Sequence, residues 1–388
     1  MNPLAVAAWS MVTPLGEGDA TINALFDQRS GFSPQPSPWK LRSALAAVVP
    51  SRPCHAVRDS QWQRYLATYV IRKVLDTLSI DLQKTRDRCT FVFATSYGHL
   101  LDDAGSDTMS TWAKDCVRNV GCDLDPIVVG SGCSSGSDAI ALAAAMLDCK
   151  TIDTAIVVAV DIVTAAKRLA HSTLGTMSVG DPKPFDIGRS GMLLGEASAA
   201  VVFMRIEDCP EDRGKLLGIG GSNDAFGLTS PDPSGLSVRL ALDRALLAAE
   251  LSYGDLALYL AHGTGTQLND DLEAKVIEEV FADNEMLTIV GTKGALGHSL
   301  GACGVVEFIL LLQILNRQLA PATVGLTDPI GSISARFPGP KGRRLSGPYG
   351  VSVTLGFGGF NTALIARAQL QMHSTPGRLV DDEMKLSF

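Results

Sequence analysis

The chain has few histidine and aromatic residues and lacks a paired cysteine motif. Six of its 388 residues are histidine, and 6% are aromatic. Its eight cysteines include no C-x-x-C pair, which argues against a zinc or thiol–disulfide redox motif. Several of these cysteines lie in apolar runs, as reduced core cysteines do in cytoplasmic proteins. We therefore expect a cytoplasmic protein.

The chain also lacks a basic N-terminus, a long apolar run and a positive net charge. The first 18 residues have no basic start and contain two prolines, which predicts a strand and turn rather than a signal peptide. The most apolar run, Val305–Leu315, is shorter than a membrane span and is interrupted by Glu307 and Gln313. A net charge of −8 argues against a general nucleic-acid binder. We expect neither nucleic acid nor a membrane as a partner.

What the chain does contain favours a large α/β protein. Its length exceeds the usual size of one domain, and 46% of the residues are hydrophobic. Short strand-type runs, such as 89–94, 154–160 and 256–261, alternate with helical patterns, such as 236–250 and 301–316.

The domain boundaries follow from composition. Proline, aspartate, glutamate and glycine cluster at 209–214, where we place a junction. We predict an N-terminal half over 1–212 and a C-terminal half over 213–372. The segment 373–388 is polar and without periodicity, which predicts a peripheral tail.

The most informative stretch is Gly-Ser-Gly-Cys-Ser-Ser-Gly at 130–136. It lies between a short apolar run and an alanine-rich helical run, which predicts a strand, a tight turn and a helix with Cys133 at the turn. A helix N-terminus offers free N–H groups and positive partial charge, which favour the thiolate of Cys133. Two interpretations fit this stretch alone: a nucleophile on a sharp turn, or a buried cysteine in a glycine-rich loop.

Two histidines lie in similar glycine-rich turns after apolar runs. His262 lies in Ala-His-Gly-Thr-Gly-Thr, and His298 in Lys-Gly-Ala-Leu-Gly-His. Glycine at several neighbouring positions indicates that something approaches the backbone closely. The turn before His298 also faintly repeats the pattern of the Cys133 turn, since each opens a very apolar helix. Together with Cys133, the two histidines favour a catalytic site.

Charged groups accompany the second histidine. Glu307 lies in an almost wholly apolar helix, and a buried carboxylate costs several kcal/mol unless it is paired. Lys293 is the partner that the spacing offers. Asp270 and Glu273 open the helix after His262, where acidic residues either complement the helix N-terminus or orient the lysine.

A last glycine-rich turn, Gly-Phe-Gly-Gly at 356–359, joins two strand-type runs near the C-terminus. It fits a plain hairpin. It also fits a turn that presents a backbone N–H to an oxyanion, with Phe357 gating an acyl pocket.

Taken together, these motifs resemble one family, the β-ketoacyl-(acyl-carrier-protein) synthases, which are condensing enzymes of thiolase fold. The markers lie along nearly the whole chain: Thr-Pro-Leu-Gly at 13–16, the Cys133 turn, Pro-Phe-Asp at 184–186 with Arg189, Gly-Glu at 195–196, His-Gly-Thr-Gly-Thr at 262–266 with Asn-Asp at 269–270, the turn from Lys293 to His298, and Gly-Phe-Gly-Gly at 356–359 with Asn361.

The resemblance implies a five-layer α-β-α-β-α fold with two related halves, usually as a homodimer. It implies a catalytic set of Cys133, His262 and His298, with Lys293 as the supporting cation. Lys293 would be linked to Glu307 and lie near Asp270 and Glu273. Backbone N–H groups of Cys133 and Phe357 would form the oxyanion hole. No metal or redox cofactor is implied, because the substrates are carried on the phosphopantetheine of an acyl carrier protein.

The reaction implied is that of a 3-oxoacyl-carrier-protein synthase, an acyltransferase of fatty acid or polyketide biosynthesis. Cys133 would take an acyl group from one carrier, and both histidines would stabilise the enolate formed when malonyl-carrier loses CO2. Other interpretations are an acyltransferase of the same fold with a non-malonyl acceptor, and a non-catalytic chain-length-factor-like partner subunit. A cysteine hydrolase is the least suitable, because His298 and Lys293 would then have no role.

Three features depart from the family pattern. Serines replace the preferred alanine and threonine around Cys133, and Met192 stands where phenylalanine is usual. The segment between Ser-Tyr-Gly at 96–98 and Cys133 is short, and typical members use it for the dimer interface and acyl pocket. Tyr97 is a candidate for the end of that pocket. These departures suggest a specialised polyketide or polyene synthase, and leave a homodimer or a heterodimer with a related subunit open.

An acidic carrier predicts a basic rim around the entrance of the site. The candidates are Arg58, Arg64, Lys183 and Arg189, although each alone fits an ordinary solvated surface position, and Arg189 fits a structural one because it belongs to a family motif.

Overall fold

The structure is a computed structural model that describes residues 1–50, 52, 58–78, 88–96, 99, 100, 102, 108–209 and 211–369. Two strand arrays with the same connectivity form its centre. Numbered along the chain within each half, the strands of both arrays lie in the order 3-2-4-5-1. The strands, in this spatial order, are β6 (Ile127–Val129), β5 (Cys89–Ala94), β7 (Thr154–Asp161), β8 (Ala197–Arg205) and β1 (Leu4–Thr13), then β11 (Thr288–Gly291), β10 (Leu256–Ala261), β14 (Tyr349–Leu355), β15 (Phe360–Arg367) and β9 (Lys215–Asn223).

The two arrays meet at their inner edges. Strands β1 and β9 pair antiparallel through Leu4 with Leu216 and Ala5 with Lys215, which joins both arrays into one hydrogen-bonded path. Strand β8 is the last strand of the first array along the chain, and β9 is the first strand of the second. The connection between them contains the predicted division at 212/213, which we keep as a proposal.

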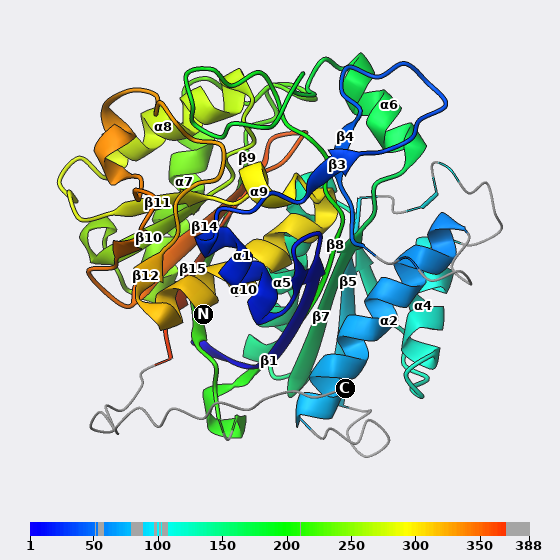
Figure 1. Ribbon diagram of the computed structural model, residues 1–388. Coiled ribbons are helices and arrows are strands. Elements are labelled where there is room, and N and C mark those ends of the chain that lie inside the picture. The colour runs from blue at the N-terminus through cyan, green and yellow to red at the C-terminus, as the bar shows by residue number, and fades with distance from the viewer. Residues whose placement is uncertain are drawn as a thin grey trace, which may run out of the picture.

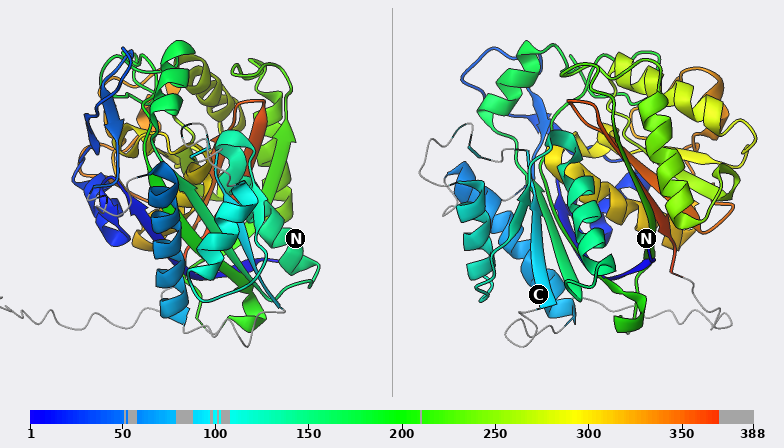
Figure 2. Two further views of the ribbon diagram at one scale, coloured as in Figure 1. Left: turned by 90° about the vertical axis from the view of Figure 1, so that its right-hand side faces the viewer. Right: turned by 180° about the vertical axis from the view of Figure 1, so that it is seen from behind.

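Helices cover both arrays and fill the space between them (Figure 1). Helices α5 (Ser135–Asp148) and α10 (Cys303–Arg317) lie between the arrays and share one hydrophobic core with both. Helices α2 (Asp59–Leu78) and α4 (Met109–Arg118) pack on the outer face of the first array. Helices α7 (Leu236–Ala249) and α8 (Gln267–Val280) pack on the outer face of the second. The predicted five-layer α-β-α-β-α fold is confirmed, as the further views also show (Figure 2).

Strand β7 shows why the sequence folds into these layers. All eight of its residues are buried. Ala155, Val157 and Ala159 face the central helices. Ile156, Val158 and Val160 face the outer ones, because successive side chains of a strand point to opposite sides. A strand with both faces covered is therefore a continuous apolar run, as in the sequence.

The remaining elements are short and mostly lie at the edges of the layers. They are β2 (Gly16–Glu17), α1 (Asp19–Phe26), β3 (Phe32–Pro34), β4 (Leu45–Ala47), α6 (Ala165–Thr173), α9 (Lys293–Leu296), β12 (Leu319–Ala320), β13 (Arg343–Arg344) and the 3-10 turns at Gly132–Ser134, Ile206–Asp208, Tyr253–Asp255, Leu300–Ala302 and Ser332–Arg336.

One segment, Leu300–Arg317, is long and apolar enough to cross a membrane, with a mean hydropathy of 1.5. It comprises α10 and the turn before it, and 89% of this window is buried inside the protein. The burial explains its composition, since a helix between two sheets contacts apolar side chains on every face. The predicted tail at 373–388 lies outside the described residues, as does Tyr97.

Candidate active site

Cys133 lies at the start of α5, after β6, with 6% of its surface exposed. Gly132 before it has φ 66°, a left-handed conformation that glycine adopts without strain. The predicted strand, tight turn and helix are therefore present.

The starts of α5 and α10 cross in close contact beside this cysteine. A Cβ on Gly136 would lie 2.9 Å from the backbone nitrogen of Val305, and one on Gly304 would lie 2.4 Å from that of Ser137. Glycine at both positions lets the two helices approach closely. This crossing brings the Cys133 turn of the first half against the His298 turn of the second, so the faint sequence repeat corresponds to two helix starts that meet at one site.

The two histidines face each other across the site. His262 follows β10, and His298 lies between α9 and the Leu300–Ala302 turn. Their ring centroids are 5.3 Å apart with the planes nearly perpendicular, and both side chains are buried. Burial, followed by the charge of Lys293, lowers the pKa of each histidine well below its ordinary value. Both imidazoles are therefore neutral near pH 7.

Lys293 holds the first of these imidazoles. Its ammonium donates to the carbonyl of His262 at 2.6 Å, to Nδ1 of His262 at 3.3 Å and to Oε1 of Glu307. An ammonium has three protons, so all are used. Because Nδ1 of His262 accepts a hydrogen bond from the ammonium, the ring proton lies on Nε2. Burial is the largest single effect and would lower the pKa of Lys293, but Glu307, Cys303 and Glu273 together outweigh it and raise the pKa.

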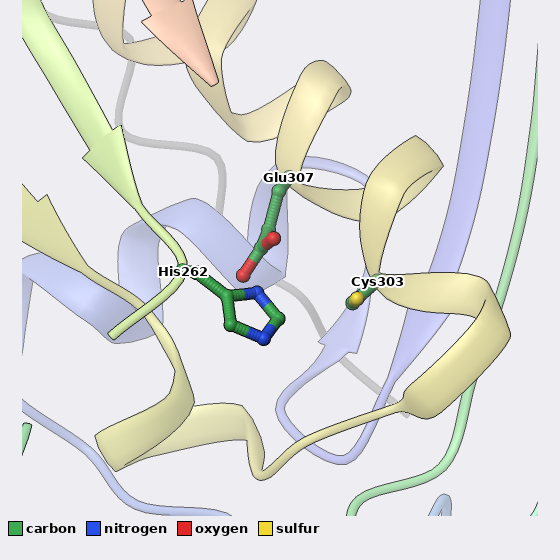
Figure 3. A group of neighbouring side chains, drawn as sticks. All are labelled: His262, Cys303 and Glu307. Carbon is green, nitrogen blue, oxygen red and sulfur yellow. The ribbon is translucent and has the colours of Figure 1, made fainter. Parts of the chain in front are cut away.

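The same neighbourhood contains a group of potential metal ligands. Figure 3 shows the side chains of His262, Cys303 and Glu307 beside one another. Their potential ligand atoms all lie within 4.8 Å of one another. The ammonium of Lys293 bonds both His262 and Glu307, so a cation already lies among these ligands. The thiol of Cys303 donates to the carbonyl of Cys133 at 3.4 Å. This group is therefore better described as an ion-pair network than as a metal site.

Asp270 and Glu273 act on the backbone rather than on the lysine. Glu273 accepts hydrogen bonds from the N–H groups of His262 and Gly263, both at 2.8 Å. Asp270 accepts from the N–H groups of Phe185 and Gly265. The hydrogen bonds of the described residues thus correct one of the two interpretations drawn from the sequence: these carboxylates fix the His262 turn, and Glu273 acts on Lys293 through its charge.

Burial raises the pKa of both carboxyl groups, to about 7 for Glu273 and about 6 for Asp270. Hydrogen bonds from backbone N–H groups oppose this shift in each case.

Phe357 lies in the turn of the hairpin formed by β14 and β15, so the hairpin interpretation is correct. The turn also closes one side of the site. The backbone N–H groups of Phe357 and of Cys133 itself both lower the pKa of the Cys133 thiol, so both are directed at its sulfur. Two N–H groups that converge on a nucleophile are the arrangement that stabilises an oxyanion.

The pKa of the Cys133 thiol is raised, whereas the sequence predicted a favoured thiolate. Burial raises its pKa to about 11, and the N–H of Phe357 and the charge of Lys293 lower it only in part. A helix start does favour the thiolate, but exclusion of water outweighs it. The resting group is therefore a thiol, and it needs a base.

A cavity of about 570 Å³ contains these groups. Cys133, His262, His298 and Phe357 line it together, although they lie far apart in the sequence. The cavity lies where several strand ends and helix starts meet, as ligand sites of open α/β sheets do.

The predicted basic rim is only partly present. Arg189 lines the cavity but is buried and pairs with Asp271, and Arg64 pairs with Asp115 on the outer helices. Arg42, which the sequence did not single out, lines the cavity and is exposed. Its position was not predictable, because it depends on a loop folding back over α6.

Comparison with known proteins places the chain in a family. Residues 125–209 match the family model for the β-ketoacyl synthase N-terminal domain, and residues 213–327 that for the C-terminal domain. Together they cover just over half of the chain. A 3-oxoacyl-[acyl-carrier-protein] synthase 2 of Mycobacterium leprae is 34% identical over 247 residues, which are 60% of this chain and 58% of that protein. The mitochondrial synthase of Arabidopsis thaliana is 34% identical over 47% of this chain and 41% of its own length. The chain thus matches less than two thirds of the length of these relatives.

Solved structures agree on the fold. A β-ketoacyl synthase from Burkholderia phymatum superposes with a TM-score of 0.79 at 24% identity, over 95% of this chain and 99% of that one. A type II PKS ketosynthase solved in complex with its acyl-carrier protein superposes with a TM-score of 0.85 at 18% identity, over 95% of this chain and 100% of that one. The motifs, the two family models and the fold lead to one conclusion: the chain belongs to the β-ketoacyl synthase family.

Proposed function

We propose that the protein is a 3-oxoacyl-carrier-protein synthase, an acyltransferase that performs decarboxylative Claisen condensation in fatty acid or polyketide biosynthesis. The observation that supports this most is the convergence in one cavity of a thiol, two neutral imidazoles and a pair of N–H groups. Retention of both histidines favours condensation over simple acyl transfer.

In the first half-reaction, Cys133 attacks the carbonyl carbon of an acyl thioester on the carrier. Its thiol proton passes to a neutral imidazole, and a bond forms between the sulfur and the carbonyl carbon. The oxygen becomes an oxyanion held by the N–H groups of Cys133 and Phe357. The bond to the pantetheine sulfur then breaks, and that sulfur takes the proton.

In the second half-reaction, malonyl-carrier occupies the cavity. The Nε2–H of His262 and an N–H of His298 donate to the thioester carbonyl oxygen, since both side chains line the cavity. The bond to the carboxylate breaks, CO2 leaves, and the electrons form an enolate. Its α-carbon bonds to the acyl carbon on Cys133, and the carbon–sulfur bond breaks. The Cys133 thiolate takes up a proton from water, which replaces the proton that left on the pantetheine sulfur.

Lys293 supports this step by position and charge. It keeps Nδ1 of His262 as an acceptor, so that Nε2 carries the donated proton. Its ammonium also stabilises negative charge on the enolate and on the thiolate. With this cation among the potential ligands, we propose that the reaction needs neither metal nor redox cofactor.

The cavity also suits the arm of a carrier protein. Among the described residues that line it, Arg42 and Arg189 are cationic and none is a carboxylate. Arg189 is neutralised by Asp271, whereas the side chain of Arg42 has no hydrogen bond or ion pair with a described residue. We propose an acyl carrier protein as the partner, with the phosphate of its pantetheine arm near Arg42.

The remaining partner proposals follow the relatives. One solved relative is a ketosynthase in complex with its chain length factor, from Xenorhabdus doucetiae. We therefore propose a dimer, either of two identical chains or with a related ketosynthase-like subunit. We also propose a cytoplasmic location, because the seven described cysteines are all unpaired thiols.

Intact mass spectrometry tests the proposal. The protein is incubated with acyl-carrier and malonyl-carrier thioesters, as wild type, Cys133→Ala and His298→Ala. We expect an acyl adduct on wild type that Cys133→Ala loses, and a 3-oxoacyl-carrier product that requires His298. An adduct without consumption of malonyl-carrier would indicate the acyltransferase instead. No adduct at all would indicate a partner subunit.

A further inference from the structure

A third buried histidine lies behind the turn that carries Phe357. His171 is near the end of α6 and is 8% exposed. Its ring centroid lies 6.1 Å from that of Phe357, with the planes inclined by 37°. The mechanism above does not use this residue.

The orientation of this imidazole is fixed from one side. Nδ1 of His171 lies 3.1 Å from the hydroxyl oxygen of Thr176. That hydroxyl donates its own proton to the backbone carbonyl of His171 at 3.2 Å. A hydroxyl has a single proton, so the imidazole must be the donor to Thr176. Thr176 lines the cavity, so this hydrogen bond fixes the imidazole of His171 to a residue of the cavity wall.

The helix under His171 is itself anchored. Lys167 forms a buried ion pair with Asp161, whose second oxygen accepts from the N–H groups of Ser96 and Gly301. Arg168 donates to the carbonyls of Gln35, Pro36 and Ala44, so it fastens α6 to the 35–44 loop.

Phe357, in contrast, lies between glycines. Gly358 and Gly359 have φ values of 83° and 80°, and their carbonyls accept hydrogen bonds from the side chains of Asn223 and Asn361, both at 3.1 Å. The rings that meet are thus a fixed imidazole and a phenyl group on a turn rich in glycine. Burial, followed by the charge of Lys167, lowers the pKa of His171 to about 4, so the ring that Phe357 meets is uncharged at neutral pH.

We propose that His171 is a positioning residue, which holds the ring of Phe357 and thereby keeps the Phe357 N–H on the sulfur of Cys133. Only the expected effect of His171 on turnover rests on the proposed function. The Phe357 N–H already acts on the Cys133 thiol in the free protein, since it lowers the pKa of that group.

The first test is the pH dependence of alkylation of Cys133 by iodoacetamide, followed on the Cys133 peptide by mass. The variant His171→Asn keeps a side chain that can donate to Thr176 but has no ring, and His171→Phe keeps a ring without the donor. Loss of a hydrogen bond to the Cys133 thiolate lowers the fraction of Cys133 that is ionised, and the thiolate is the form that iodoacetamide alkylates. We therefore expect Cys133 in His171→Asn to be alkylated about 5- to 10-fold more slowly at pH 8. His171→Phe should stay near the wild-type rate.

The second test is acylation of Cys133 by an N-acetylcysteamine thioester. An oxyanion-hole contact acts in the transition state, so His171→Asn should lower kcat at least about 10-fold and leave KM nearly unchanged. Phe357→Ala should cause a similar loss, and the double variant should add little, because both changes remove the same contact. Additive losses would contradict the proposal.

His99 offers a matched control. It is buried in the same half, its Nδ1 lies 3.1 Å from the side-chain oxygen of Gln63, and its ring lies 6.1 Å from that of Trp112. His99→Asn removes a comparable buried ring and should leave the alkylation profile of Cys133 unchanged. Equal shifts in both histidine variants, or no shift in His171→Asn, would overturn the proposal. If wild type is alkylated but never acylated, the proposed function fails while the positioning test still stands.

Discussion

At the scale of single residues, the site depends on charges that are matched one to one. Lys293 and Glu307 are each almost fully buried, and every proton of the ammonium has an acceptor. Because such a pair pays a large desolvation cost, removal of one member leaves the other uncompensated. The sequence predicted this pairing from a single glutamate in an apolar helix.

Lys293→Met should destabilise the fold by about 3–5 kcal/mol, since Glu307 then stays buried without a counter-ion. The double variant Lys293→Met with Glu307→Leu should be more stable than Lys293→Met alone, because no charge is left buried. Urea unfolding of the three proteins measures this. A double variant less stable than the single one would show that the pair itself, rather than the orphaned charge, supplies the stability.

Arg42→Ala tests the carrier arm at the cavity mouth. With an acyl-phosphopantetheine substrate, we expect KM to rise about 10-fold and kcat to stay the same, because one charge-assisted hydrogen bond to phosphate is lost. With acyl-pantetheine, which has no phosphate, the variant should equal wild type. Lys341→Ala, an exposed cation elsewhere, controls for net charge. An equal loss with both substrates would rule out phosphate recognition by Arg42.

At the scale of elements, periodicity predicted most of what the structure contains, and close backbone contact explains much of what it missed. The buried strands and the long apolar helices were visible as apolar runs. Strand β9 was not, because glycine stands at 218, 220 and 221. A Cβ on Gly220 would lie 1.9 Å from the carbonyl oxygen of Ala241 in α7, so packing, not strand propensity, selects glycine there.

Gly220→Ala should therefore lower stability by about 1–3 kcal/mol or more, since α7 must move away from the sheet. Gly221→Ala is the matched control on the same strand, because nothing lies within 4 Å of its added Cβ. Thermal melts of both variants give the comparison. Similar losses at the two positions would mean that strand conformation, not the helix contact, requires glycine.

In the candidate site, too, local sequence patterns predicted some residues and missed others. Cys133, His262, His298 and Lys293 were predictable because they lie in distinctive turns. His171, Thr176 and Arg42 were not, because they reach the site through α6 and through a loop whose path no local pattern encodes. The sequence also did not predict that the pKa of Cys133 is raised, since a sequence does not show how completely water is excluded from a site.

At the scale of the whole molecule, buried carboxyl groups link stability to pH. Glu273 has a pKa raised to about 7 by burial, against an ordinary value near 4.5. The folded state therefore retains a proton that the unfolded state loses first, so this group lowers stability as pH rises from about 4.5 to about 7.

Glu273→Gln cannot ionise and should remove this part of the pH dependence. The Tm of wild type minus the Tm of Glu273→Gln should fall from pH 5 to pH 8, because only wild type loses stability there. Glu278→Gln, an exposed change on the same helix, should keep a constant difference from wild type. A difference that stays constant from pH 5 to pH 8 would mean that Glu273 is already ionised at pH 5 in the folded protein, and would contradict the raised pKa.

The pairing of β1 with β9, which joins the two halves, links segments that are synthesised at very different times. Strand β1 is among the first described elements to leave the ribosome, yet it pairs with β8 and β9, which are made roughly 200 residues later. At translation rates of about 5–20 residues per second, this apolar strand waits roughly 10–40 s for its neighbours. Proteolysis of stalled nascent chains should show protection of residues 4–13 only after β8 and β9 emerge. Until then most of β1 has backbone groups without a partner strand, since only its end pairs with β2, and a growing chain would benefit from a chaperone that covers them.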